Sequence, residues 1–528
     1  MATGPRSGLI IFVAVLASLL EIIDTSIVNV ALPTMMGNLG CTLEDISMII
    51  TGYAIANAIV LPASAWAGER FGRRRYFLTC IALFTVASVA CGLAPNLFFL
   101  IVFRIIQGLM GGALLPTSQA LIYEQFPKEK AGMAGAIFGM SVMIGPALGP
   151  VMGGYLTDNF GWRSIFNINL PMGLLALSLG LIAIQDRTAT TAENAKAAGQ
   201  AKQVRKFDGI GLALLVLGIG ALQFVLERGE ADDWFSSNII VFNAILATVC
   251  LPAFVWWELR VKSPILNVRL LKERIVLNGI SLMACLGFFL YGLVFLLPVF
   301  VGLAYHYTAT QTGVLFIPGS ILTAFLMPFI GKAMTSGVNP KKLIFVGLVL
   351  IELCVFSLTT LSPLSSQTEI LRSLYIRGLA MAFMFVPINS AILSQFSGMQ
   401  LGEVSGLLNL FRQLGGSAGV ALVATLLSSY GHQNRLDLAA HVSLLNPATQ
   451  QAYYPSVAGL AKKTQNGLGM AQGSQAALRT LNYRLEAQVF MLSFNQLIWT
   501  MGLIFSLAFI PWYLIKLKRG PVALVDAH

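Results

Sequence analysis

The chain has 528 residues, of which 56% are hydrophobic and only 11% are charged, whereas a typical soluble domain carries about a quarter charged residues. This composition excludes a water-soluble globular protein, because its surface could not be solvated by water. The formal net charge of +11 does not indicate nucleic-acid binding, since the Lys and Arg residues stand in short loops between apolar stretches. We therefore expect an all-α polytopic membrane protein.

Apolar stretches long enough to cross a bilayer, about 20 residues each, recur along the chain. They predict fourteen spans, at residues 9–32, 46–68, 76–94, 97–117, 131–155, 163–185, 209–227, 238–258, 275–302, 312–331, 342–361, 370–395, 404–428 and 488–515. Because this number is even, both termini lie on one side of the membrane. The loops on that side hold most of the Lys and Arg residues, which marks it as cytoplasmic.

The first span carries two acidic residues, Glu21 and Asp24. An ionised Asp near the centre of a membrane helix costs about 2.5–3.5 kcal/mol, so it needs a partner or a task. Arg104, in the fourth span, is the cation expected to pair with Asp24. Burial disfavours a charged carboxylate and a nearby cation favours it, so movement between such environments could load and release a proton. We expect Asp24, Arg104 and Glu21 to carry proton coupling; a static buried pair is the alternative.

The turn after the second span is strongly basic. It reads Glu69-Arg70-Phe71-Gly72-Arg73-Arg74-Arg75. The predicted cytoplasmic gate consists of Glu69, Arg70, Gly72, Arg73 and Arg74, which could clamp neighbouring helix ends when that side is closed. A weaker basic echo follows the tenth span at Lys332, Lys341 and Lys342. Repeats of this kind mark secondary transporters whose two bundles rock around a central site.

The fifth span combines small residues with prolines. They are Gly145, Pro146, Gly149, Pro150, Gly153 and Gly154. Glycines four residues apart form overlapping GxxxG steps, which allow another helix to approach closely. The prolines remove backbone donors and bend the span. The pattern alone predicts a tight helix interface and no particular function.

Composition divides the chain into parts. The predicted parts are a six-helix bundle at 1–185, a polar cytoplasmic linker at 186–207, two inserted spans with a cytoplasmic connector at 208–274, and a second six-helix bundle at 275–528. The second bundle contains a long outside loop at 429–487. Within this loop Leu478, Leu481 and Leu485 show helical spacing, so it is more patterned than a plain linker.

Polar side chains inside the spans are candidates for binding an amphiphilic substrate, which needs an apolar cavity with a few polar groups. The predicted substrate-binding residues are Asp24, Tyr53, Asn57, Gln107, Tyr291, Arg377, Asn389, Asn409 and Arg412. We expect many of them to serve only as hydrogen bonds between helices. Arg377, Arg412 and Glu352 could also pair with one another.

Several of these segments form a recognisable set. They are Asp24-Thr25-Ser26-Ile27-Val28-Asn29-Val30-Ala31-Leu32-Pro33 in the first span, the turn at 69–75, Arg104-Ile105-Ile106-Gln107-Gly108 in the fourth span, the Gly-Pro run of the fifth span and Asn409-Leu410-Phe411-Arg412-Gln413-Leu414-Gly415. Together they resemble the signatures of the major facilitator superfamily, and in particular its fourteen-helix drug:proton antiporter branch, the EmrB-like proteins. Two departures fall at the gate, where Glu69 replaces the family's usual Asp and Ala65 its leading Gly.

The resemblance implies two six-helix bundles with two inserted helices, and a proton-coupled antiporter that exports amphiphilic drugs or toxic compounds across a bacterial inner membrane. It identifies the Gly-Pro run of the fifth span as the antiporter motif. The stretch around His432 and Arg435 resembles the outside loop of EmrB-type pumps. This implies docking to a periplasmic adaptor protein and, through it, to an outer-membrane channel. The other expected partners are membrane lipid and amphiphilic small molecules.

No cofactor is expected. The sequence contains no GxxxxGK[ST] loop for binding ATP, and neither its cysteines nor its histidines have the spacing of a metal site. The proton gradient is therefore the expected source of energy. No arrangement of residues indicates an enzyme.

Two other transporter functions stay open. A proton-driven peptide importer can also have fourteen helices, but its first helix carries an ExxER-type motif, and Glu21-Ile22-Ile23-Asp24-Thr25 lacks the Arg. A dedicated exporter of a lipid or a siderophore would have the same fold, because the cavity cannot be read from the sequence.

Overall fold

The computed structural model describes residues 5–185, 208–262, 264–305, 307–362, 365–442 and 470–515, together with short stretches between residues 447 and 457. These residues form helices joined by short turns, without any strand. In this described part of the chain, 14 helices are long and apolar enough to cross a membrane. The prediction of an all-α polytopic protein with fourteen spans is confirmed.

The first six spans are built from α1 to α7. Their bounds are α1 (Pro5–Leu39), α2 (Leu43–Phe71), α3 (Arg73–Gly92), α4 (Leu97–Glu124), α5 (Ala131–Phe160), α6 (Ser164–Asn167) and α7 (Asn169–Ala183), with the short 3-10 helix η1 (Lys128–Lys130) before α5. Helix α1 packs against α4, α5 and α7. It therefore lies inside this group and not at its edge.

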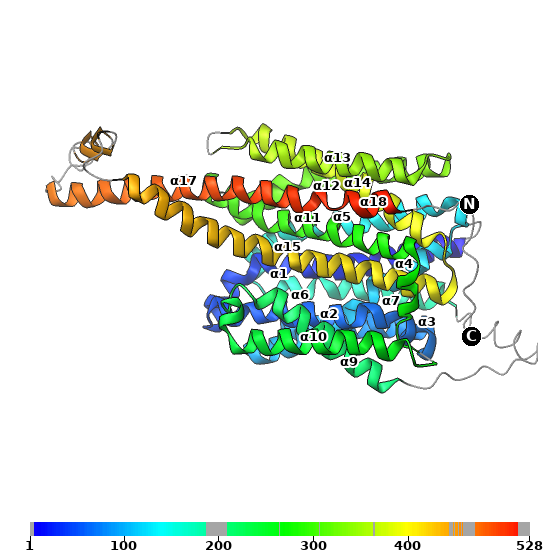
Figure 1. The fold of residues 1–528 in the computed structure, drawn as a ribbon. Coiled ribbons are helices and arrows are strands. Elements are labelled where there is room, and N and C mark those ends of the chain that lie inside the picture. The colour runs from blue at the N-terminus through cyan, green and yellow to red at the C-terminus, as the bar shows by residue number, and fades with distance from the viewer. Residues whose placement is uncertain are drawn as a thin grey trace, which may run out of the picture.

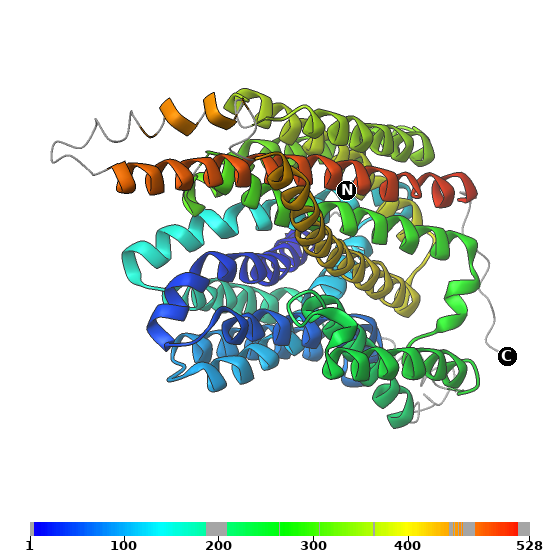
Figure 2. The same cartoon turned by 60° about the vertical axis from the view of Figure 1, so that its left-hand side comes forward.

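The remaining eight spans begin with two inserted helices. Their bounds are α9 (Gly209–Arg228), α10 (Asn238–Glu258), α11 (Arg274–Tyr305), α12 (Ala309–Thr335), α13 (Pro340–Thr359), α14 (Gln367–Leu393), α15 (Gly398–His441), α17 (Met470–Ser506) and α18 (Phe509–Leu514), with η2 (Trp234–Ser236) and η3 (Val268–Lys272) between them. Helices α11 to α18 make up the last six spans. Helices α9 and α10 pack on each other at one edge of the bundle, where α9 also contacts α2 and α15 (Figures 1 and 2).

Short polar residues define where several of the spans begin. Thr42 accepts a hydrogen bond from the backbone N–H of Asp45, and the Asp45 carboxylate accepts one from Thr42 in return. The same reciprocal cap begins α12 at Thr308 and α14 at Ser366. Such caps satisfy the free N–H groups of the first helical turn. Within the spans the helices bond their own backbone, as a hydrocarbon environment requires.

Three predicted segments differ from the structure. The predicted span 163–185 is divided into α6 and α7, and the last predicted span into α17 and α18. Both ends of the predicted loop 429–487 are helical, because α15 continues to His441 and α17 begins at Met470. Helices α15 and α17 extend beyond the apolar bundle, as Figure 1 shows. The extended parts are rich in polar residues. The predicted linker 186–207 lies outside the described residues.

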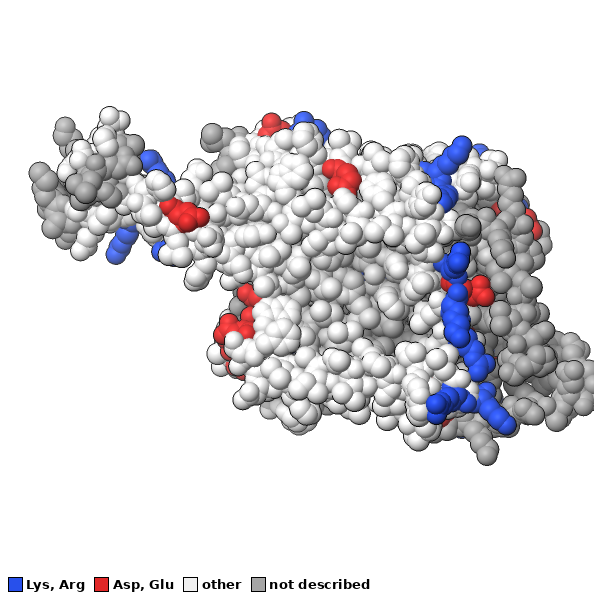
Figure 3. Space-filling model, in the orientation of Figure 1, with Lys and Arg blue, Asp and Glu red and all other residues white. Residues whose placement is uncertain are grey.

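Charged residues are distributed along the long axis of the molecule in a way that fits a membrane protein. In Figure 3 a band of Lys and Arg side chains marks one end of the bundle, and a broad surface almost free of charge adjoins it. Helix α1 begins and α18 ends at this same end (Figure 1). We call it the basic end. The projecting parts of α15 and α17 lie at the opposite end.

Candidate functional site

A polar network surrounds Asp24, which is fully buried near the middle of α1. Arg104 Nη1, from α4, lies 2.5 Å from Asp24 Oδ2. Asp24 Oδ1 accepts hydrogen bonds from Gln107 Nε2 of α4 and from Asn169 Nδ2 of α7, each at 2.8 Å. The carboxylate therefore has a cation on one oxygen and two amide donors on the other.

Arg104 has further partners besides its ion pair. Its Nη1 also donates to Gln107 Oε1 at 2.9 Å, and its Nε donates to the backbone oxygen of Ile49 at 3.4 Å. The guanidinium carbon lies 4.2 Å from the centre of the Tyr53 ring. A buried ion pair persists when additional hydrogen bonds satisfy its remaining polar atoms. The structure thus brings Asp24 and Arg104 together, and it places Gln107 and Tyr53, predicted as substrate contacts, around them.

The sequence prediction omits Asn169 and Ser88. Asn169 Nδ2 donates to Ser88 Oγ at 2.9 Å as well as to Asp24, and Ser88 Oγ donates to the backbone oxygen of Phe166 at 2.9 Å. This chain fixes the amide that holds the Asp24 carboxylate. The available signal was a pair of carboxamides, Asn167 and Asn169, near the start of the predicted span 163–185.

Glu21 lies one turn before Asp24 on α1 and is 4% exposed. Its Oε1 accepts a hydrogen bond from Asn57 Nδ2 of α2 at 3.0 Å. Gly111 of α4 faces the same region, where a Cβ would lie 2.7 Å from the Tyr53 hydroxyl and 3.4 Å from Glu21 Cγ. Arg412 of α15 is the cation whose charge acts on Glu21, and Asp24 adds a like charge. Glu21 is therefore the carboxylate of α1 that is coupled to the last six spans.

Arg412 is buried on α15 and has neutral partners. Its Nη1 donates to the Tyr291 hydroxyl of α11 at 2.8 Å, and its Nη2 donates to Asn409 Oδ1 at 3.4 Å. Tyr291 and Asn409, predicted as substrate contacts, are thus hydrogen-bonded to protein groups in this conformation. No carboxylate among the described residues forms an ion pair with Arg412.

Gln119 connects the first six spans to the last six spans. This fully buried side chain donates from Nε2 to Asn389 Oδ1 of α14 at 2.8 Å. Its Oε1 accepts from Ser405 Oγ at 2.5 Å and from Asn409 Nδ2 at 2.8 Å, both on α15. One amide therefore joins α4 to two helices of the other group. The sequence prediction omits Gln119, because nothing in the sequence shows which helix it would face.

Further contacts between the two groups lie beside Gln119, toward the basic end. The hydroxyls of Tyr123 on α4 and Ser390 on α14 are 3.3 Å apart, and Ser390 Oγ donates to the backbone oxygen of Ala131 at 3.1 Å. Helices α5 and α12 cross at glycines, where a Cβ on Gly132 would lie 2.6 Å from the Gly331 oxygen. The two groups of spans are thus closed against each other at the basic end.

The predicted gate lies at the turn between α2 and α3. Gly72 adopts a φ of 87°, which residues with a Cβ rarely adopt. Arg73 forms an ion pair with Glu124 of α4, and its Nη2 donates to the backbone oxygen of Gly398 on α15 at 3.5 Å. Arg73 is therefore the gate residue that reaches the other group of spans.

Two other predicted gate residues, Arg74 and Arg70, make contacts within the first six spans. Arg74 Nη2 donates to the backbone oxygen of Leu181 at 2.9 Å. The Arg70 guanidinium lies 5.9 Å from the centre of the Trp66 ring. Glu69 stands in the last turn of α2. These contacts anchor the turn, whereas the contact from Arg73 crosses between the two groups.

The glycines of α5 pack on α1. A Cβ on Gly145 would lie 2.3 Å from Ile22 Cγ2, and one on Gly149 would lie 1.9 Å from Ser26 Oγ. A Cβ on Gly153 would lie 2.8 Å from the Ile27 oxygen, so α1 contacts α5 over three turns.

The opposite face of α5 meets α12. A Cβ on Gly154 would lie 2.9 Å from Thr310 Oγ1, and one on Gly313 would lie 3.1 Å from Pro150 Cβ. The predicted tight interface is thus formed within the first six spans, and α5 links α1 to the other group.

Glu352, Arg377 and Arg412 of the last six spans do not form ion pairs with one another, so that expectation is wrong. Glu352 accepts a hydrogen bond from Ser506 Oγ of α17 at 3.1 Å. The Arg377 guanidinium lies 5.2 Å from the centre of the Phe316 ring, and its Nε and Nη1 have no hydrogen-bond partner. These charges are held by different helices, so the sequence could not show that they lie apart. Arg377 also lies outside the hydrogen-bond network around Asp24 and Gln119.

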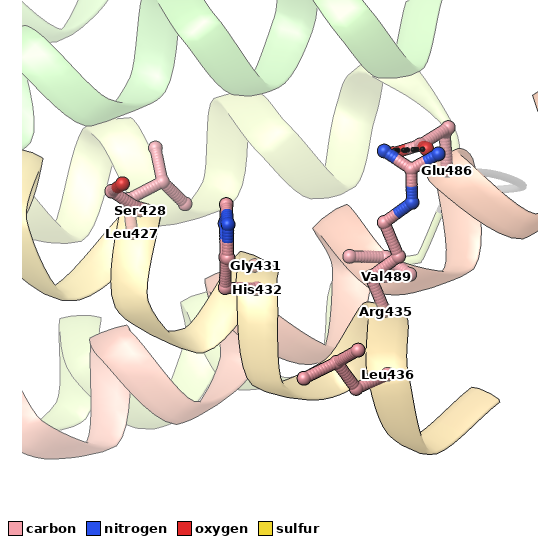
Figure 4. Close-up of a pocket in the computed structure, with 8 residues that line it drawn as sticks. All are labelled: Leu427, Ser428, Gly431, His432, Arg435, Leu436, Glu486 and Val489. Atoms are coloured by element: carbon pink, nitrogen blue, oxygen red, sulfur yellow. Dashed lines mark ion pairs between the residues drawn. The ribbon is translucent and has the colours of Figure 1, made fainter. Parts of the chain in front are cut away.

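A pocket of about 440 Å³ lies between the projecting parts of α15 and α17. Figure 4 shows His432 and Arg435 on α15, with Glu486 of α17 opposite. Arg435 Nη1 lies 3.0 Å from Glu486 Oε1. Leu427, Leu436 and Val489 add apolar surface to the lining. The stretch around His432 and Arg435 is therefore exposed on a helical surface beyond the apolar bundle.

Metal-ligating side chains do not gather in this structure. No group of three or more His, Cys, Asp or Glu residues could hold a metal ion within the described ranges. The six cysteines are all free thiols. The chemistry of the site therefore lies in its carboxylates, guanidinium groups and amides.

The sequence matches the family model of the Major Facilitator Superfamily over residues 14–420, which is more than half of the chain. It is 33% identical over 501 residues to the Multidrug export protein EmrB of Escherichia coli strain K12, covering 94% of this chain and 93% of that protein. The Fatty acid resistance protein FarB of Neisseria gonorrhoeae is 32% identical over 507 residues, covering 96% of this chain and 95% of that protein.

Solved structures share the fold at low sequence identity. The human organic anion transporter MFSD10 (TETRAN) has a TM-score of 0.56 and 15% identity, covering 94% of this chain and 100% of that chain. The proton:xylose symporter XylE bound to 6-bromo-6-deoxy-D-glucose has a TM-score of 0.53 and 16% identity, covering 79% of this chain and 87% of that chain. The chain therefore belongs to the Major Facilitator Superfamily, among its EmrB-like members, and is a multi-pass membrane transporter and not an enzyme.

Proposed function

We propose that this protein is a proton-coupled antiporter that exports amphiphilic drugs or toxic compounds across the bacterial inner membrane. Relatives named Multidrug export protein EmrB, which match nearly the whole chain, support the export of drugs. A proton crossing about 100 mV and one pH unit releases roughly 2.3 plus 1.4 kcal/mol. That energy is enough for a substrate gradient of several hundred-fold at unit stoichiometry.

The observation that carries the proposal is the pair of buried carboxylates on α1. The partners of Asp24 on α4 and α7 all belong to the first six spans, so a rocking motion of these spans as one body leaves them in place. Glu21 is instead coupled to Arg412 on α15, so the same motion changes the charge near Glu21. Two close carboxylates titrate as a pair. We propose that Glu21 senses the position of the last six spans and that Asp24 and Arg104 hold or release the proton.

The described conformation is closed at the basic end, which we place in the cytoplasm because basic loops favour that side. Both termini are then cytoplasmic. Gln119 and Tyr123 bond across the two groups of spans there. In this state a proton would reach the carboxylates from the outside, and opening of the basic end would release it to the cytoplasm. The polar residues of the spans that bond to one another here would then become free to contact substrate.

Helix α5 is proposed to transmit this motion. Its glycines pack on the part of α1 that carries the carboxylates, with Gly145 against Ile22 and Gly149 against Ser26. Its other face meets Gly313 of α12. Because close-packed helices cannot deform gradually, a tilt of α12 should displace α5 and α1 together.

The projecting parts of α15 and α17 are proposed to dock a periplasmic adaptor protein and, through it, an outer-membrane channel. These helices extend beyond the apolar bundle on the side opposite the basic end (Figure 1). Their pocket, with Arg435 and Glu486 at its rim, offers both apolar and charged contacts (Figure 4). Such a mixture suits a partner that binds in water.

The test is transport by purified protein in proteoliposomes with an imposed pH gradient. The probes are tetraphenylphosphonium, a lipophilic cation, and decanoate, a fatty acid, because one relative is named for fatty acid resistance. We expect proton-dependent movement of at least one probe, and its loss in Asp24→Asn and Glu21→Gln. Asp158→Asn, which alters an exposed acid near the end of α5, is the matched control. Probe movement that ignores the pH gradient would overturn proton coupling.

A further inference from the structure

The inserted helix α9 carries a carboxylate that belongs to neither the Asp24 network nor the basic end. Glu227 Oε1 accepts hydrogen bonds from Ser417 Oγ of α15 at 2.8 Å and from Gln223 Nε2 at 2.9 Å. Gln223 Nε2 also donates to Ser417 Oγ at 2.7 Å. Three side chains thus close a ring between α9 and α15.

This ring contains one more acceptor than its donors can satisfy. Gln223 is fully buried, and its Oε1 has no hydrogen-bond partner. The N–H groups of Gln223 and the O–H of Ser417 already donate within the ring. A buried acceptor without a donor destabilises the conformation that contains it. A protonated Glu227 carboxyl group is a donor that lies on the same helix face as Gln223, four residues away.

Among the residues that the structure describes, no cation forms an ion pair with Glu227. Besides burial, the groups that act on it are the neutral side chains Ser417 and Gln223. The charged groups on α9 and on the helices packed against it have other partners or lie elsewhere. Arg228 on α9 pairs with Asp232 at 2.7 Å, and Arg412 on α15 donates to Tyr291. Glu44 and Asp45 lie in the first turn of α2, and Glu258 lies at the far end of α10 beside Gly211. The ring is therefore suited to a neutral, protonated carboxyl group.

Helix α9 also bonds to the first six spans. Arg228 Nη1 donates to Ser47 Oγ of α2 at 2.9 Å and to the backbone oxygen of Glu44 at 3.3 Å. The inserted helix thus bridges α2 and α15, which belong to different groups of spans. Relative motion of the two groups must strain one of these contacts, and the contact to α15 contains the titratable group.

We propose that Glu227 is a second proton-binding carboxylate, in a site formed with Gln223 and Ser417 between the inserted helix α9 and α15. Its protonation state sets the strength of the contact between α9 and α15, while the neighbouring Arg228 keeps the same end of α9 bonded to α2. The proposal extends the proposed proton-coupled transport, but proton binding at this site can be measured without any transport.

The experiment is infrared difference spectroscopy of the full chain in lipid nanodiscs across a pH titration, which detects the carbonyl stretch of protonated carboxyl groups. We expect Glu227→Gln to lose one component of this band, and Glu230→Gln, a nearby acid with no contact to the ring, to keep it. Asp24→Asn should also keep this component, so failure of the proposed coupling site and failure of the present proposal give different results. An unchanged band in Glu227→Gln would overturn the proposal.

A second variant keeps the test valid if Glu227→Gln does not fold. Ser417→Ala retains the carboxyl group and withdraws one donor from its ionised form. At a given pH it should therefore leave a larger share of Glu227 protonated, which shifts the titration of the same band component. A titration identical to that of the unaltered protein would show that the ring does not bind the proton.

Discussion

Asn169, the first residue of α7, donates a hydrogen bond to Asp24 on α1 at 2.8 Å. Asn169 and Gln107 both donate hydrogen bonds to Asp24 Oδ1, the carboxylate oxygen that Arg104 does not contact. The charge of Asp24 is thus stabilised from two other helices. A residue that the sequence does not single out therefore helps to hold the Asp24 carboxylate.

Replacing Asn169 should change the pH dependence of transport. A hydrogen bond to a charged group is worth about 1.5–3 kcal/mol, and 1.36 kcal/mol corresponds to one pH unit. Asn169→Ala removes a donor to the ionised form, so we expect the pH profile of probe transport to move to higher pH by about one unit or more. Asn159→Ala, whose side chain bonds only to the backbone of α5 in this structure, is the control. An unmoved profile would show that Asn169 does not act through Asp24.

Replacing Gln119 should loosen the closed basic end. Gln119→Leu removes one hydrogen bond from each of Asn389, Ser405 and Asn409. Ser405 and Asn409 keep other acceptors, whereas Asn389 Oδ1 loses the donor that Gln119 supplies, and a buried polar group left unpaired costs about 1–3 kcal/mol. We expect the conformation with an open basic end to gain population. Spin labels at Lys128→Cys and Ser336→Cys, two exposed positions near the basic end, would report a longer distance.

Gln125→Leu is the matched control for this measurement, because the Gln125 side chain donates only to the backbone of its own helix at Leu121. It should leave the label distance unchanged. Equal distances in the unaltered protein and in Gln119→Leu would show that the amide does not hold the two groups of spans together.

A methyl group at Gly149 should destabilise the fold. The added Cβ would lie 1.9 Å from Ser26 Oγ and 2.6 Å from Ser26 Cβ, so α1 or α5 must shift. Overpacking of this kind costs about 1–3 kcal/mol, which would lower the melting temperature of Gly149→Ala. In Gly37→Ala the added Cβ meets nothing within 4 Å. Equal melting temperatures for the two variants would contradict the close contact between α1 and α5.

Removing the Arg73 side chain should slow transport more than it destabilises the protein. The ion pair with Glu124 is partly exposed, at 34% and 13% of the two side chains, and such pairs contribute about 0–1 kcal/mol. Arg73 also bonds to α15 across the two groups of spans. Arg73→Gln should therefore reduce the turnover rate while the melting temperature stays nearly constant. Arg74→Gln, which loses a contact within the first six spans, should keep a higher rate.

From the sequence alone one can predict that lipid surrounds this protein and how many times the chain crosses the membrane. Apolar stretches of bilayer length recur fourteen times, and a helix is the structure that satisfies its own backbone in lipid. The pairing of Asp24 with Arg104 also followed from sequence, because two isolated charges in apolar spans are costly unless they meet. Local spacing likewise predicted the helix that contains Leu478 and Leu485, although not that it continues into the last spans.

Which side chains face one another depends on how the helices pack, and this is seen in the tertiary structure alone. Gln119, Asn169 and Glu227 are polar residues within or at the end of apolar spans, and they have partners on helices distant in the sequence. Helix periodicity fixes the face on which a residue lies, but the rotation and the neighbour of each helix depend on packing among all the spans. For that reason the ion pair could be foreseen, whereas the amides that hold it and the contacts that close the basic end could not.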